Sequence, residues 1–318
     1  IMLDKSHSGP RCRRFLNVST GKCIRTDLPE LAEHMLLTLT PEGLLLLLHE
    51  HTLVVRLLNP LTRQLTDLPP VTGLLTEEDQ QAWRSGCPLE DMLRVVGAGL
   101  AGASTVAVCF RWPTALAVSR PGDENWTVAD DRDIDSALAC AGHFYCAIRS
   151  SVMVLDTNDL DQQPPRLRLV ATAGSMPFCF FRISHSLHLV DNAGELMLVH
   201  RKLGQDTDAQ GGDKYKRNYQ LFRVDLEAGA LVPAKDFRGR AVFMSSRRTI
   251  SVSVGAFSSV SADTLYLGFD CPEKNWIDRI DGYNVADGSS EPSYHGLQPC
   301  SVVDCLSYCI RGNGVHLA

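Results

Sequence analysis

The sequence predicts an all-β fold, a β-propeller built from four-stranded blades. Three observations indicate this fold. Short apolar segments rich in Val, Leu, Ile, Phe and Tyr alternate with turns that carry Gly, Pro, Asn and Asp. These segments fall into groups of four that recur about every 40–60 residues, and helical periodicity is scarce. We expect five to seven blades. A β-sandwich is the structural alternative, but it needs fewer strands than this length provides.

The clearest repeat unit is LVVRLLNPLTRQLTDLPP at residues 53–70. An apolar strand ends at Leu58, and Asn59-Pro60 then forces a turn, because Pro fixes its own φ and disfavours helix at the preceding residue. An alternating strand follows and stops at Pro69-Pro70. The segment therefore predicts a strand, a turn and a second strand that closes one blade.

Five groups of strands follow this pattern. The first contains 35–39, 44–49, 53–58 and 63–67; the second contains 93–96, 105–111, 115–119 and 126–129; the third contains 134–140, 143–149, 152–156 and 166–171. The fourth contains 178–181, 186–191, 195–201 and 220–225, with 231–235 as a further strand; the fifth contains 241–244, 250–254, 264–269 and 282–285. Residues 15–18 and 22–25 are expected to add strands to the last blade, which removes an exposed sheet edge and closes the propeller.

The expected domain organisation is a single propeller at 14–300, between an irregular basic tail at 1–13 and a C-terminal tail at 301–318. Two inter-strand insertions interrupt it, at 72–92 and 203–218. The first holds the best helical candidate, 76–84, and the polar segment 206–217 is expected to be a surface loop.

Composition favours a globular protein with a substantial core, since 44% of the residues are hydrophobic and 21% are charged. A net charge of −6 argues against strong binding to nucleic acid or to an anionic membrane. No segment reaches the ~18 consecutive apolar residues of a membrane helix. The chain does not begin with Met, so we expect a fragment whose upstream part is missing.

The eleven cysteines are scattered, without a CxxC pair or zinc-finger spacing. They are expected to be free thiols in a reducing compartment, which places the protein inside the cell, in cytoplasm or nucleus. The only cluster, Cys300, Cys305 and Cys309, lacks an obvious fourth ligand, so no metal or other cofactor is expected.

Gly97-Ala98-Gly99-Leu100-Ala101-Gly102 matches the phosphate-binding turn of flavin or nicotinamide enzymes, with Asp123 or Glu124 about 20 residues further on. That chemistry needs a helix to begin at the last glycine. The β-branched residues that follow, and Pro113, instead predict an inter-strand loop. A dinucleotide-dependent oxidoreductase that uses residues 97–102 is kept as an alternative.

A hydrolase is the other enzymatic alternative. His185 and His188 lie near Asp191 and beside Ser184 and Ser186, but no GxSxG or HExxH motif occurs. His188 alternates with leucines along a strand, which is typical of a solvent-facing or hydrogen-bonded histidine. The acidic pair Asp130-Asp131 is expected to be solvated. The sequence therefore assigns no catalytic, cofactor-binding or metal-ligating residue and no binding face. Three tryptophans are expected to pack or to line a face: Trp112, Trp126 and Trp276.

The segment Leu28-Pro29-Glu30-Leu31, with Trp83-Arg84 downstream, superficially matches the two ends of an F-box. Its spacing is too long, and the residues between are strand-turn-strand rather than helical, so an F-box inside the chain is rejected.

A series of phrases nevertheless resembles a family of plant F-box proteins whose C-terminal part is a β-propeller. The phrases are 19–21, 28–31, 42–45, 55–62, 115–118, 121–123 with Trp126, 142–145, 187–201, 222–225, 240–243 and 265–267. Val232-Pro233-Ala234 departs from the family, which usually has a Trp there.

The resemblance implies a non-enzymatic protein-interaction propeller that resembles the substrate-recognition part of a cullin-RING ubiquitin ligase receptor. Its partner would be a target protein, with the ligase adaptor added only if an F-box precedes residue 1. The family has no catalytic residues to carry over.

Overall fold

The computed structural model describes residues 2–5, 12–157, 163–172, 183–205, 215–245, 248–257, 260–268, 270–271 and 280–292. They belong to two compact units. The N-proximal unit comprises Lys5–Arg13 and Arg25–Val170, and the C-proximal unit comprises Ile1–Asp4, Arg14–Ile24 and Ala171–Ala318. Helices are few and short, and none of those described is long and apolar enough to cross a membrane.

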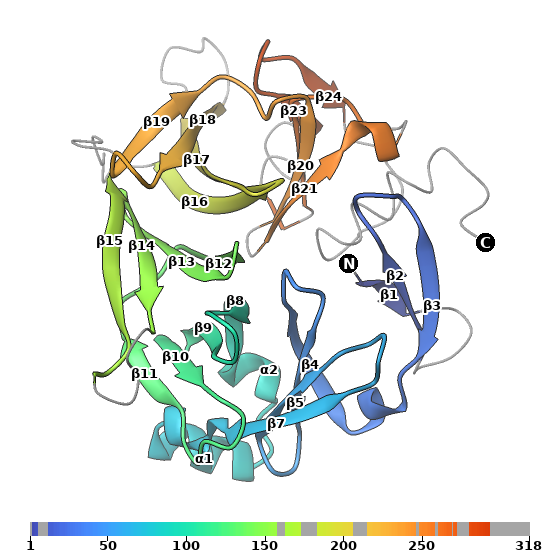
Figure 1. Ribbon diagram of the computed structural model, residues 1–318, viewed down its shortest axis with the longest axis vertical. Helices are drawn as coiled ribbons and strands as arrows, with labels where there is room; N and C mark the ends of the chain where they lie inside the picture. The colour runs from blue at the N-terminus through green and yellow to red at the C-terminus, as the bar shows by residue number, and fades with distance from the viewer. Residues whose placement is uncertain are drawn as a thin grey trace. The chain divides into compact units, whose positions relative to one another are not determined.

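The N-proximal unit contains three groups of four antiparallel strands in sequential order (Figure 1). The strands are β4 (His34–Leu39), β5 (Leu45–His49), β6 (Val54–Leu58) and β7 (Leu65–Pro70); β8 (Arg94–Leu100), β9 (Val106–Trp112), β10 (Ala115–Ser119) and β11 (Thr127–Asp130); and β12 (Ser136–Cys140), β13 (His143–Ile148), β14 (Ser151–Asp156) and β15 (Arg166–Thr172). The first three predicted groups are therefore confirmed.

The middle strands of these groups are buried on both faces. Leu45 to Leu48 of β5 and Val106 to Phe110 of β9 are each 2% exposed or less. Sheets that pack face to face bury both sides of a strand, so the sequence there is a continuous apolar run rather than an alternation. One core joins the first two groups and a second core joins the next two.

The turn at Asn59-Pro60 forms as predicted. The Asn59 side-chain oxygen accepts hydrogen bonds from the backbone N–H groups of Leu61 and Thr62, at 2.9 and 3.2 Å. This Asx geometry satisfies the backbone where β6 ends. The structure differs at the far end, because Pro69 and Pro70 belong to β7 instead of following it.

The insertion at 72–92 contains the predicted helix as α1 (Glu77–Arg84). Thr76 and Asp79 form a reciprocal capping box at its start. A 3₁₀ turn, η2 (Val71–Leu74), and the short α2 (Leu89–Met92) flank it. Trp83, Leu74 and Leu89 pack on the first core, which fixes the insertion to the unit.

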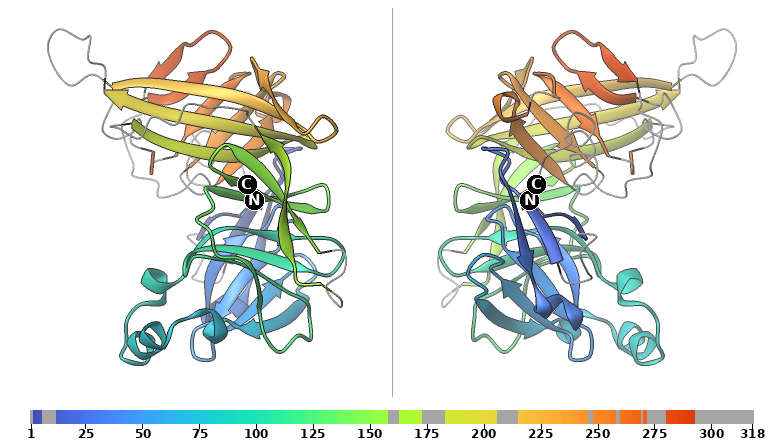
Figure 2. Two further views of the ribbon diagram at one scale, coloured as in Figure 1. Left: turned by 90° about the vertical axis from the view of Figure 1, so that its left-hand side faces the viewer. Right: turned by 90° about the vertical axis from the view of Figure 1, so that its right-hand side faces the viewer.

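The fourth group lies in the C-proximal unit as β16 (Ile183–Asn192), β17 (Glu195–Gln205), β18 (Tyr215–Asp225) and β19 (Ala230–Ala234). Its long strands stand out in Figure 2. The predicted strand 178–181 lies outside the described residues. The insertion expected at 203–218 is shorter, because β17 runs on to Gln205 and β18 begins at Tyr215, ahead of the predicted Gln220.

The fifth group departs from a simple meander. Its order is β21 (Thr249–Ser253), β20 (Arg240–Met244), β22 (Thr264–Leu267), β23 (Ile280–Asn284) and β24 (Ser290–Pro292), and β20 pairs with β22 in parallel. This group therefore has five strands where four were expected.

The N-terminal strands form a sheet of their own, from β1 (Met2–Lys5), β2 (Cys12–Leu16) and β3 (Cys23–Asp27). The structure thus places β1 and the start of β2 in the segment that was expected to be irregular. Within the C-proximal unit, Leu16 and Val18 pack against Phe243 and Val252 of the fifth group. The contact is between side chains, so these strands pack on the fifth group without extending its hydrogen-bonded ladder.

Candidate functional site

The glycine-rich motif lies in a strand, and the prediction of an inter-strand loop is wrong. Residues 97–100 form the second half of β8, paired with β9 at Gly97–Cys109 and Gly99–Ala107. A β-carbon on Gly97 would overlap the carbonyl oxygen of Ala137 in β12, and one on Gly99 would overlap the Ala139 side chain. The glycines therefore allow two strands to approach closely.

This geometry does not suit a pyrophosphate. No helix begins at Gly102; the chain turns there and enters β9. A phosphate-binding turn needs free N–H groups at a helix N-terminus. The second half of the motif is also largely buried, so the dinucleotide alternative has no support in this segment.

The serine–histidine set in β16 is only partly assembled. Ser186 Oγ lies 2.8 Å from His188 Nε2, and Arg201 donates a hydrogen bond to the same oxygen at 3.2 Å. Asp191 lies on the opposite face of the strand and accepts a hydrogen bond from Gly194 in the hairpin turn. The acid of a triad is therefore not beside His188.

Burial weakens this histidine as a base. His188 is 5% exposed. Burial, with a smaller contribution from the charge of Arg201, lowers the pKa of His188 to about 3. A general base works best when its pKa lies near the operating pH. The pair is thus a hydrogen-bonded buried histidine, one of the two readings expected for His188.

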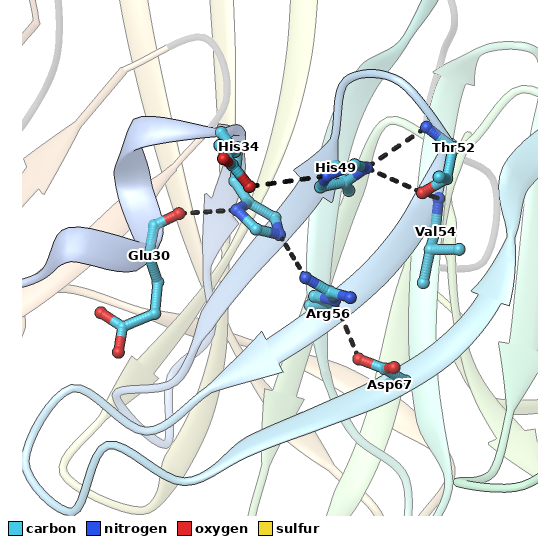
Figure 3. Close-up of polar contacts among 8 residues, drawn as sticks. Glu30, His34, His49, Thr52, Val54, Arg56 and Asp67 are labelled. Carbon is cyan, nitrogen blue, oxygen red and sulfur yellow. Dashed lines mark hydrogen bonds and ion pairs between the residues drawn. The ribbon is translucent and has the colours of Figure 1, made fainter.

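A second polar network lies on the first strand group (Figure 3). His34 of β4 contacts the carbonyl oxygen of Glu30 through Nδ1 at 2.6 Å, and Arg56 of β6 reaches His34 Nε2 at 3.0 Å. Arg56 also donates from Nε to Asp67 of β7 at 2.9 Å. The chain of contacts crosses from the turn η1 (Pro29–Ala32) to the last strand of the group.

These partners determine the tautomer of His34. The Glu30 carbonyl can only accept, so Nδ1 carries the proton, and the Arg56 guanidinium can only donate, so Nε2 is the acceptor. Burial lowers the pKa of His34, the hydrogen bond to Glu30 opposes this, and the Arg56 charge lowers the pKa further. Neutral His34 thus supports Arg56 in an orientation that leaves the guanidinium partly exposed.

His49 of β5 extends the network. Its Nδ1 accepts from the Thr52 backbone N–H at 3.3 Å, and its ring meets the His34 ring edge-on at 5.0 Å. Its Nε2 faces Glu33 at 3.9 Å. The network offers hydrogen-bonding groups at the surface but contains no serine, cysteine or lysine nucleophile. Its chemistry suits strand cross-linking and polar recognition.

The exposed Trp112 is the most prominent candidate for partner binding. It ends β9, and its side chain is 58% exposed. Arg94 lies opposite it on β8, and Arg111 precedes it. By contrast, Trp126 is 8% exposed and donates from Nε1 to the Pro69 carbonyl at 2.9 Å. Trp126 is thus a core residue, and Trp276 lies outside the described residues.

A cavity of about 350 Å³ opens beside the β10–β11 turn. The turn contributes Arg120, Asp123, Glu124 and Asn125, and Pro164 closes the other side. Asp123 accepts from the Arg120 backbone N–H at 2.7 Å, which fixes the shape of the turn. The cavity has charges of both signs and no histidine or cysteine.

The described cysteines agree with the expectation of free thiols. Six are free: Cys23, Cys87, Cys109, Cys140, Cys146 and Cys271. Burial raises the pKa of Cys109 to about 12, which removes its nucleophilic character. No metal-binding group of histidine, cysteine or carboxylate residues occurs in the part of the chain described; Cys300, Cys305 and Cys309 lie outside it.

The model of the KIB1-4 beta-propeller family matches residues 15–289. The chain belongs to this family. KIB1-4 β-propellers are found in plant F-box proteins, which confirms the resemblance given by the sequence phrases. A search of curated proteins finds no match. The absence of helices between Leu31 and Val71 agrees with the rejection of an F-box at the Leu28-Pro29 phrase.

Sequence reasoning missed two features of this KIB1-4 propeller. The His34–Arg56–Asp67 network joins residues up to 33 positions apart, and only strand register brings them together. The exposure of Trp112 follows from its place at a strand end before Pro113, a signal that its composition alone does not carry.

Proposed function

We propose that this chain is a non-enzymatic target-binding propeller, the part of an F-box receptor that holds the protein to be ubiquitinated by a cullin-RING ligase. The observation that carries the proposal is membership of the KIB1-4 family across residues 15–289, since these propellers occur in F-box proteins. In such a receptor the F-box contacts the ligase adaptor, and the propeller contacts the target.

The surface of the N-proximal unit supports this function. Trp112 presents a large, rigid aromatic side chain to solvent, with Arg94 opposite. Trp and Arg are enriched among the residues that dominate protein–protein binding energy. The described residues that looked catalytic, Gly97–Gly102 and Ser186–His188, serve packing and burial instead.

The test joins the chain to an F-box from an unrelated receptor and expresses the fusion in plant cells. Quantitative proteomics is expected to show that a small set of proteins falls in abundance and recovers when cullin neddylation is inhibited. Trp112→Ala is expected to restore the abundance of those proteins. Leu61→Ala, which truncates another exposed apolar side chain (68% exposed), is the control and is expected to retain depletion.

Two results would overturn the proposal. One is an unchanged proteome relative to the F-box alone, with the fusion shown to assemble into the ligase. The other is turnover of a substrate by the purified chain in a broad hydrolase and oxidoreductase screen.

A further inference from the structure

The last strands of the four-strand groups differ in how well their outer edges are protected. β7 carries Pro69 and Pro70, β11 has four residues, and β19 carries Pro233. Short length and proline both prevent another strand from adding to an edge. β15 has seven residues and no proline. It is therefore the strand of this set best able to accept an additional strand.

The outer side of β15 is largely unpaired within the described residues. β14 is its neighbour on one side, as Figure 1 shows. On the other side, only Thr172 pairs, with Ala230 of β19. Residues 166–170 lie in the N-proximal unit and leave a row of backbone N–H and C=O groups directed away from β14.

The side chains of this segment give the edge a charge and an apolar surface. Arg166 and Arg168 are exposed, and neither forms an ion pair with a described residue. Leu169 is 52% exposed although it is a large apolar residue. A partner strand placed here would meet two unpaired guanidinium groups and one leucine side chain.

We propose that residues 166–170 of β15 form a docking edge, to which an acidic extended segment of a partner protein adds as a further strand. Backbone hydrogen bonds would supply much of the affinity, as in other cases of strand addition. Carboxylates of the partner would pair with Arg166 and Arg168, and an apolar residue would cover Leu169. The proposal rests on the proposed target-binding function and gives the target a chemical character.

Charge selects the occupant. A second copy of the chain would place its own Arg166 and Arg168 near those of the first, and like charges opposite each other destabilise a strand pair. A basic segment meets the same repulsion. An acidic segment is the occupant that neutralises both arginines.

The test uses fluorescence anisotropy with a labelled nine-residue peptide of alternating Glu and Val. The wild-type chain is expected to bind it, and Arg166→Glu with Arg168→Glu is expected to weaken binding tenfold or more. The same double variant should instead bind a Lys–Val peptide. Arg84→Glu with Arg94→Glu makes the same change in net charge elsewhere and is expected to keep binding of the Glu–Val peptide.

Methylated peptides test whether the contact is a strand pair. In an added strand, alternate N–H groups face β15, so methylating the amides of one residue type should abolish binding while methylating those of the other should not. A thermal unfolding curve for each variant shows that the fold is intact.

Four outcomes would overturn the proposal. They are no binding by the wild-type chain, equal loss in the two double variants, equal tolerance of both methylation patterns, and self-association of the chain that the peptide does not compete with. The first outcome would mean that the arginines only protect the edge from aggregation. Depletion of target proteins by the F-box fusion could still occur in each case, so failure here is distinguishable from failure of the proposed function.

Discussion

Strands β8 and β15 belong to the same unit and to neighbouring groups, yet their sequences mislead in opposite ways. β8 carries a glycine motif that matches a nucleotide-binding turn, and its glycines are buried against β12. β15 carries no motif, and it exposes Arg166, Arg168 and Leu169. The residues with the stronger motif have the structural role, and those without one face solvent.

The difference has a physical origin. A strand packed between sheets is selected for the space that its neighbours leave, and glycine is required where two backbones approach closely. An edge strand is selected for what it offers or denies to other chains. β16 in the other unit follows the first pattern, since its Ser186–His188 pair is held in a buried network with Arg201.

The largest expected effect comes from filling the space beside β8. Gly97→Ala would place a β-carbon 2.9 Å from the Ala137 carbonyl carbon and closer still to its oxygen, and backbone atoms cannot move aside easily. We expect a loss of about 2–3 kcal/mol in the free energy of unfolding. Gly99→Ala meets mainly the Ala139 side chain and should cost less. Urea denaturation of the purified variants measures both losses.

Gly73→Ala is the matched control, because its β-carbon would have no neighbour within 4 Å. It is expected to change the free energy of unfolding by less than about 0.5 kcal/mol. An equal stability of all three variants, combined with a loss of dinucleotide binding in Gly99→Ala, would reverse the interpretation of β8.

The two tryptophans extend the comparison to a single residue type. Trp126→Phe removes the hydrogen bond from Nε1 to the Pro69 carbonyl in a buried site and is expected to cost roughly 1–2 kcal/mol of stability. Trp112→Phe is expected to leave thermal stability unchanged, because that side chain is exposed. Thermal unfolding of the two variants compares them directly, and a greater loss for Trp112→Phe would contradict the assignment of core and surface.

Acid sensitivity should report the buried histidines. The pKa of His188 is lowered to about 3 and that of His200 to about 4, mainly by burial. Between pH 6.5 and 5 the unfolded chain binds protons at these histidines and the folded chain does not, so stability should fall as the pH falls through this window. His188→Leu is expected to reduce that slope in urea titrations. An unchanged slope would mean that His188 is accessible to protons in the folded chain.

The smallest effect is expected at the surface. Arg63 donates to Glu30 from Nη2 at 2.6 Å, but its side chain is 44% exposed. Arg63→Ala is expected to cost only about 0.5 kcal/mol, and added salt should reduce the difference from the wild-type chain. A loss above that of Trp126→Phe would show that the turn η1 depends on this ion pair.

Much of the fold could be predicted from local sequence. The hairpins of the first three groups follow from apolar runs bounded by turn residues, and the Asx turn at Asn59 satisfies its own backbone. Helix α1 follows from the Thr76–Asp79 capping box. These features depend on neighbours within a few residues, which single-sequence reasoning can assess.

The rest depends on contacts between distant segments. The close approach of β8 to β12 decides that residues 97–100 are a strand, and Ala137 lies 40 positions from Gly97. The parallel pairing of β20 with β22 likewise requires a crossover that no local pattern encodes. The polar network of His34 and Arg56 and the open edge of β15 arise from register and from sheet order.

Hydrogen–deuterium exchange of the whole chain, with and without the Glu–Val peptide, tests most directly whether binding occurs at the exposed edge and not at the glycine-rich strand. The account predicts slower exchange in peptide fragments covering residues 166–170 and no change in those covering 94–100. A parallel sample with a dinucleotide should show no change in either segment. Protection of 94–100 by the dinucleotide, with none of 166–170 by the acidic peptide, would contradict the account.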